Sequence, residues 1–118
     1  MKKIQILVLN FVILIQLSCS SSKSTTDSKF AKAPIPDVQM LPVAQMKYPG
    51  ITLESLTEGH RIYTNECTNC HGVKSVKSEP ESEWLSIIDR MAPKANLSPD
   101  QKKKVLEYIL SSREFVSK

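Results

Sequence analysis

The chain has 118 residues, 41% of them hydrophobic, and its 16 basic and 12 acidic side chains give a formal net charge of +4. Lys2 and Lys3 lie in an N-terminal segment with the composition of an export signal, and without them the charge falls to +2. So small a charge excludes a nucleic-acid-binding protein that relies on a basic surface. The length allows one small folded domain.

Residues 1–18 have the organisation of a signal peptide. Two lysines are followed by an apolar run from Ile4 to Leu17, which only Asn10 and Gln16 interrupt. This run is too short to span a bilayer comfortably. Residues 1–18 are therefore predicted to be an export signal.

The next cysteine carries a second targeting signal. Leu17-Ser18-Cys19-Ser20 resembles the lipobox of bacterial lipoproteins, in which the cysteine becomes the lipidated first residue, although Gln16 stands where that family usually has leucine. An ordinary signal peptide is the alternative, and it would leave Cys19 as an odd free thiol in an exported protein. The resemblance implies a protein of the bacterial cell envelope, lipid-anchored to a membrane and facing the periplasm. Each buried acyl methylene would contribute about 0.8 kcal/mol to this anchoring.

Residues 19–50 have the composition of a tether. Serine, threonine and lysine come first, and four prolines follow without a sustained apolar period. Most of this segment is predicted to be unstructured. The partly apolar stretch from Val38 to Met46 is expected to lie as an extended strap over the folded domain.

Residues 51–118 are predicted to form an all-α domain of three to four helices. Helical periodicity runs from about Leu53 to Asn69, from about Glu81 to Met91, and from Ser98 to about Ser112. No segment alternates in the manner of a strand. A core made of protein alone is marginal at this length, so a bound prosthetic group would supply much of the missing apolar contact.

Local signals mark the ends of two of these helices. Pro80 suits the first turn of the second helix, and Pro93 is expected just beyond its end. The third helix has the clearest start, because Ser98 is followed by Pro99 at the first helical position and by Gln101 where a capping box would have it.

Cys67-Thr68-Asn69-Cys70-His71 matches, in order and spacing, the attachment site of a c-type haem. Two cysteines three residues apart lie about one helical turn from each other, so both sulfurs can reach the vinyl groups of one porphyrin while His71 turns toward the iron. A zinc site would need four ligands, and Cys19 and His60 are the only other cysteine and histidine. A redox dithiol would follow a strand. A disulfide is the remaining alternative.

The segment from Glu58 to Gly72, which includes this motif, resembles the first helix and haem motif of the small single-haem cytochrome c family, and Val105–Leu110 resembles its last helix. The resemblance implies a fold wrapped round one covalently bound haem. It also implies that the first and last helices cross, with Gly59, Tyr63 and Tyr108 at their contact.

The family's second iron ligand is commonly a methionine on the far side of the haem, well after the motif. Met91 fits this position, whereas Met40 and Met46 precede the motif in the predicted tether. The alternative for Met91 is simple core packing beside Trp84. Given a haem, iron ligation by Met91 is the prediction.

His60 is the rival sixth ligand and would give a bis-histidine iron. It lies seven residues before Cys67, on the helix that presents the haem cysteines. Its ring is therefore expected near the same side as His71, where it would pack between helices or face solvent.

Axial ligation by His71 and Met91 would leave no open coordination site on the iron. The chain is accordingly predicted to be a monomeric single-electron carrier between membrane-bound or periplasmic redox proteins, and not an enzyme. Two alternatives stay open: a haem peroxidase or gas or redox sensor with an open sixth position, and a fixed haem subunit of a larger membrane complex. Lys94 and residues 102–104 could guide a redox partner, or form the solvated face of the last helix.

Overall fold

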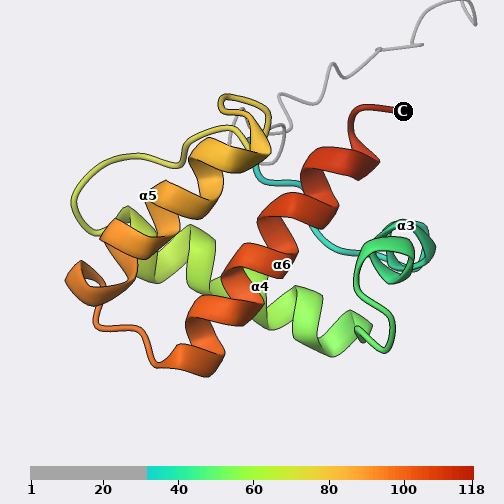
Figure 1. Ribbon diagram of the computed structural model, residues 1–118, viewed down its shortest axis with the longest axis horizontal. Helices are drawn as coiled ribbons and strands as arrows, with labels where there is room; N and C mark the ends of the chain where they lie inside the picture. Colours follow the sequence, from blue (N-terminus) through green and yellow to red (C-terminus); the bar gives the residue numbers. More distant parts are fainter. Residues whose placement is uncertain (1–31) are drawn as a thin grey trace, which may run out of the picture.

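The computed structural model describes residues 32–118, which form helices and loops without any strand. The elements are α3 (Met40–Lys47), α4 (Leu53–Asn65), the 3-10 helix η1 (Glu66–Thr68), α5 (Glu81–Lys94) and α6 (Pro99–Phe115) (Figure 1). The predicted all-α class is confirmed for these residues. None of the helices between residues 32 and 118 is both long and apolar enough to cross a bilayer. The predicted signal peptide and Cys19 lie outside the described residues.

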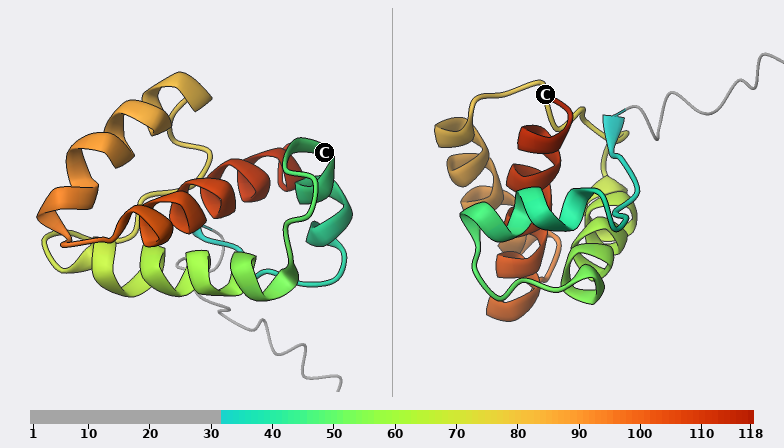
Figure 2. Two further views of the ribbon diagram at one scale, coloured as in Figure 1. Left: turned by 60° about the horizontal axis from the view of Figure 1, so that its bottom comes forward. Right: turned by 90° about the vertical axis from the view of Figure 1, so that its right-hand side faces the viewer.

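The centre of the fold is the crossing of α4 and α6 (Figures 1 and 2). A Cβ atom on Gly59 would lie 2.7 Å from Cβ of Tyr108 and closer still to the backbone carbonyl of Lys104. The rings of Tyr63 and Tyr108 pack at the same place, with centroids 6.0 Å apart. The expected helix crossing at these residues is therefore confirmed, and it depends on the missing side chain at Gly59.

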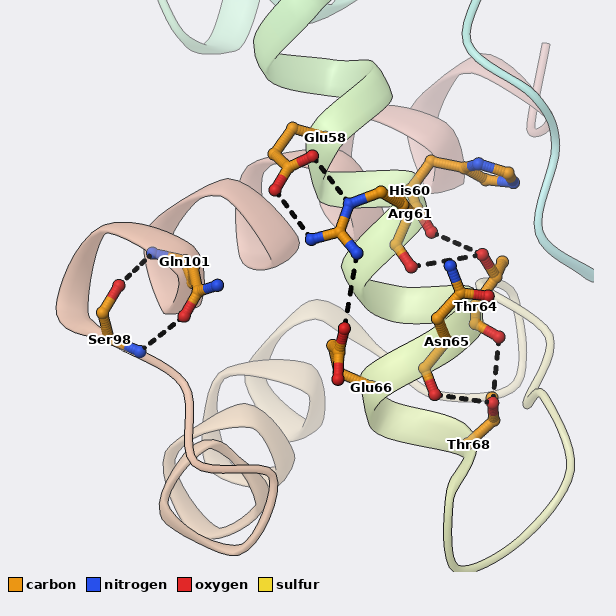
Figure 3. Close-up of polar contacts among 9 residues, drawn as sticks. All are labelled: Glu58, His60, Arg61, Thr64, Asn65, Glu66, Thr68, Ser98 and Gln101. Carbon is orange, nitrogen blue, oxygen red and sulfur yellow. Dashed lines mark hydrogen bonds and ion pairs between the residues drawn. The ribbon is translucent and has the colours of Figure 1, made fainter.

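The predicted haem motif begins just after α4 ends. Helix α4 stops at Asn65, four residues before the predicted end, and η1 continues the chain to Thr68. The Thr68 hydroxyl donates to the carbonyl oxygens of Thr64 and Asn65, at 2.9 and 3.1 Å (Figure 3). Such local bonds compete with the regular helix and favour a tighter last turn. The turn presents Cys67 on η1, while Cys70 follows it.

Helix α5 runs past its predicted end and includes Pro93. A proline in the last turn removes only one helical hydrogen bond, so the helix tolerates it there. The true end signal is Asn96, which has a φ of 54°. Around it Asn96 N–H donates to the Pro93 carbonyl and Leu97 N–H to the Ala92 carbonyl, the pattern of a Schellman motif.

Helix α3 is the largest departure from the sequence prediction. The extended strap predicted within residues 19–50 is wrong, because Met40–Lys47 is helical and packs against α6. Pro42 lies in the first turn, where no helical hydrogen bond is lost, and the Asp37 carboxylate accepts the N–H groups of Gln39 and Met40. Two turns are too short for a periodic apolar pattern, so the helix is not evident from the sequence.

The predicted capping box of α6 is confirmed, and its removal gives a first test of the fold. The Ser98 hydroxyl accepts from Gln101 N–H at 3.2 Å, and the Gln101 side chain accepts from Ser98 N–H at 2.9 Å (Figure 3). Ser98→Ala is expected to lower the free energy of unfolding by about 1 kcal/mol. Urea unfolding followed by circular dichroism measures this change. An unchanged midpoint would show that the box contributes nothing to stability.

Candidate functional site

A pocket lies between α5 and the loop of residues 72–80 that precedes it. Its volume is about 360 Å³. Cys67 and His71 line it from the haem motif, and Met91 lines it from the last turn of α5. Its apolar wall consists of Val73, Trp84, Ile87 and Ile88.

A second pocket, of about 490 Å³, shares Cys67, His71 and Met91 with the first and adds Cys70. Lys94, Ala95 and Asn96 lie on its outer side. Both volumes fall in the range of about 300–1,000 Å³ that is usual for ligand sites. The structure therefore brings all four residues predicted from the motif and its partner methionine to one contiguous region.

His71 is exposed, and its ring is oriented by the backbone. The Nδ1 atom lies 2.9 Å from the carbonyl oxygen of Gly72. A carbonyl only accepts, so Nδ1 must carry a proton in this contact, and in the neutral ring the lone pair then lies on Nε2. His71 is thus prepared to bind a metal through Nε2.

The two cysteines of the motif are free thiols. Cys70 is exposed, whereas Cys67 is half-buried and packs against the core cluster. Burial, with a smaller contribution from the charge of Glu66, raises the pKa of the Cys67 thiol. A dithiol oxidoreductase needs the opposite, a thiol whose pKa is lowered. The surroundings of Cys67 therefore favour a protonated thiol and argue against redox-dithiol chemistry.

This environment predicts unequal thiol reactivity in the chain without haem. Only the thiolate is alkylated, so raising the pKa of Cys67 lowers its reactive fraction at any pH below that pKa. We expect Cys67 to react with iodoacetamide severalfold more slowly than the exposed Cys70, and Glu66→Gln to accelerate only Cys67. Peptide mass spectrometry between pH 7 and 9 measures both rates. Equal rates would contradict the described environment.

The described methionines differ clearly in their surroundings. Met46 is 80% exposed, and Met40 is fully buried, where its sulfur accepts from the Ser112 hydroxyl at 3.6 Å. Met91 is half-buried and lines both pockets. Within residues 32–118, Met91 is thus the methionine that the fold places beside the haem motif.

His60 lies in a different part of the fold. Its ring meets Tyr108 edge-on, with centroids 5.3 Å apart, and it lines neither pocket. Figure 3 shows the ring projecting from α4 on the side opposite the guanidinium of Arg61, which pairs with Glu58 and Glu66. The geometry places His60 in helix packing, away from the candidate site.

The pocket wall depends on two aromatic donors whose partners the sequence did not reveal. The Trp84 indole Nε1 donates to the Val76 carbonyl at 3.0 Å, and the Tyr63 hydroxyl donates to the Lys74 carbonyl at 2.7 Å. Burial raises the pKa of Tyr63, so its hydroxyl stays protonated and remains a donor. Buried tryptophan and tyrosine normally find a hydrogen-bond acceptor. From the sequence, only this rule could have indicated that Trp84 and Tyr63 bond to a neighbouring loop.

The lysines of α6 do not form an unbalanced basic surface. Lys102 pairs with Asp89 at 2.6 Å, Lys104 with Asp100 at 2.8 Å, and Lys103 approaches Glu107 at 3.8 Å. Exposed pairs of this kind contribute little to stability, about 0–1 kcal/mol each. The acidic partners offset the positive charge of these lysines. The pairing therefore favours the interpretation that the lysines form the solvated face of α6 over the interpretation that they guide a redox partner.

Among protein-family models, curated proteins and solved structures, nothing matches the chain. Within residues 32–118, no three side chains of histidine, cysteine, aspartate or glutamate are grouped so that they could hold a metal ion. A porphyrin would itself provide four of the six iron ligands, leaving two for the protein. His71 and Met91 are the histidine and the methionine that line the pockets, and both side-chain types serve as axial haem ligands.

Proposed function

We propose that this chain is a single-electron carrier of the bacterial cell envelope, with one haem attached through Cys67 and Cys70 and with His71 and Met91 as axial ligands of its iron. The observation that carries this proposal is the shared lining of two adjoining pockets by Cys67, His71 and Met91.

The thiols suit covalent attachment. Each is free, and each would add its S–H across one vinyl group, so that a carbon–sulfur bond forms and the thiol hydrogen moves to the neighbouring carbon. This addition is redox-neutral and needs no external oxidant. The Cys67 thiol is half-buried, and its raised pKa keeps it protonated. Both features keep it reduced until the haem is attached.

The axial residues would set the iron's behaviour. When bound, the haem would supply an iron that alternates between the ferrous and ferric states. His71 presents Nε2 because Gly72 holds its Nδ1 proton, and Met91 presents a soft thioether that favours the ferrous state. The apolar side chains of Trp84 and its neighbours would lower the polarity around the iron, which acts in the same direction.

Lipid attachment at Cys19 remains part of the proposal, although Cys19 lies outside the described residues. Residues from Ala33 onward are packed into the domain, so only the chain between Cys19 and Lys32 separates the lipid from the fold. Thirteen residue steps span at most about 45 Å. The redox partners are therefore expected at or close to the same membrane. Radioactive fatty acid should label the chain and leave Cys19→Ala unlabelled.

The carrier proposal is tested by ligand binding to the reduced protein. Protein made in a host with haem-attachment machinery should give a low-spin spectrum and should not bind carbon monoxide, because both axial positions are filled. Reversible one-electron titration should follow. A high-spin spectrum with rapid carbon monoxide binding would contradict the carrier and favour a peroxidase or sensor.

A further inference from the structure

Residues 32–39, here called the N-terminal strap, lie against the wall of the candidate haem pocket. The wall in question is the loop of residues 72–80, here called the pocket loop. We propose that the N-terminal strap is a positioning element of the site, which holds the pocket loop in place and thereby fixes the position of the pocket wall. Only its effect on bound haem rests on the proposed function.

The contact between the two segments is direct. The N–H of Val76, in the middle of the pocket loop, donates to the carbonyl oxygen of Lys32 at 2.8 Å. The neighbouring Ala33 is fully buried and belongs to the same core cluster as Val76 and Trp84. The strap therefore contacts the loop at Val76, which lines neither pocket.

The same loop residue contacts a pocket-lining side chain through its other backbone group. The Val76 carbonyl accepts the Trp84 indole at 3.0 Å, and Trp84 lines the pocket. Strap, loop and pocket wall are thus connected in series through one residue. Loss of the strap would leave the buried N–H of Val76 without its acceptor. Because an unpaired buried donor costs free energy, the loop is then expected to move so that this N–H reaches water.

The strap is held to α6 at Pro34, and the chain that follows it is anchored at Met40 and Lys47. The Tyr108 hydroxyl donates to the Pro34 carbonyl at 2.9 Å, and Met40, just after the strap, is fully buried against α6. Farther along, Lys47 at the end of α3 pairs with Glu81 at the start of α5, at 2.5 Å. In Figure 2 the chain from residue 32 runs across the bundle to α3. These contacts make the strap part of the domain.

The test uses a substitution in the strap, which leaves every residue of the loop and of the pocket lining unchanged. Ala33→Gln puts a larger polar side chain where the exposed fraction is 0%, and Val38→Gln makes the matched change where it is 73%. Each is made in the full-length chain, without haem and after haem attachment. Without haem, hydrogen exchange at the Val76 amide should quicken about tenfold in Ala33→Gln only, while exchange at Ile62 in α4 stays unchanged. Alkylation of the half-buried Cys67 should also quicken, with the exposed Cys70 as internal reference.

After haem attachment, Ala33→Gln should lower the reduction potential, because water near the iron favours the ferric state. Val38→Gln should leave it unchanged. Val76 exchange that stays slow in Ala33→Gln would overturn the proposal, and so would faster exchange with no change in Cys67 alkylation or in potential. If Ala33→Gln does not fold, Tyr108→Phe replaces it and should shift the same readouts by a smaller amount. Failure of haem attachment would overturn the carrier proposal alone, since exchange and alkylation still decide the role of the strap.

Discussion

Met91→Ala should abolish the charge-transfer band that marks thioether ligation of ferric haem, and it should allow carbon monoxide to bind the ferrous protein. Met91 lies in the last turn of α5 and lines both pockets beside His71. Removing its sulfur would open the sixth position and lower the reduction potential by on the order of 0.1 V, a fraction of the range of about 0.8 V that axial ligands cover. Optical spectra and a redox titration of the haem-loaded variant measure these effects.

Met46→Ala provides the matched control for this experiment. Met46 is 80% exposed at the end of α3 and lines neither haem-site pocket, so its replacement should leave the band and the potential unchanged. A Met91→Ala protein that keeps the band would show that another group is the sixth ligand.

Gly59→Ala is expected to lower the free energy of unfolding by about 2 kcal/mol, despite the better helix propensity of alanine. Alanine gains about 1 kcal/mol over glycine inside a helix. The new methyl group, however, would collide with the Lys104 carbonyl and with Cβ of Tyr108, so α4 and α6 would have to separate. Overpacking costs about 1–3 kcal/mol. The upper end applies here, because the backbone carbonyl of Lys104 cannot rotate away as a side chain can. Subtracting the propensity gain leaves a net loss of about 2 kcal/mol.

Gly72→Ala is the control for the helix-crossing test. Nothing lies within 4 Å of a Cβ built on Gly72, and the backbone carbonyl that contacts His71 would be kept. Its urea-unfolding midpoint should stay near that of the parent chain. Equal stability of the Gly59→Ala and parent proteins would contradict the close approach of α4 and α6.

The parts of the fold that sequence reasoning predicted correctly are those with local chemical signals. Ser98 and Gln101 form the capping box that their spacing indicates, and Pro99 occupies the first turn. The crossing of the first and last helices was expected from the resemblance, and a missing side chain at Gly59 is what permits it. Each of these features depends on a few residues, and the pattern of those residues indicates mainly one local structure.

The errors arise where long-range contacts decide the outcome. Met40–Lys47 has no clear helical period, and it becomes a helix because Met40 and Ala44 bury themselves against α6. Pro93 was taken as a helix stop, although the αL conformation of Asn96 ends the helix. A proline near a helix end is compatible with either side of it, so the sequence alone does not place the boundary.

The candidate site likewise combines features that the sequence predicted with features that it did not. The spacing of Cys67, Cys70 and His71 predicts a haem motif, and the position of Met91 after it predicts the second iron ligand. The structure places the four residues around adjoining pockets, and their haem-binding roles stay predictions. The contact between the pocket loop and the N-terminal strap could not be predicted. The hydrogen bond between Val76 and Lys32 joins residues 44 positions apart, and it involves only backbone atoms.

The most direct test of the central claim is the mass of the intact chain after expression in a host with haem-attachment machinery. The account predicts a gain equal to one haem, with both Cys67 and Cys70 protected from alkylation after denaturation. The double variant Cys67→Ser, Cys70→Ser should show no gain. A parent chain that carries no added mass, or one in which Cys67 and Cys70 are joined as a disulfide, would contradict it.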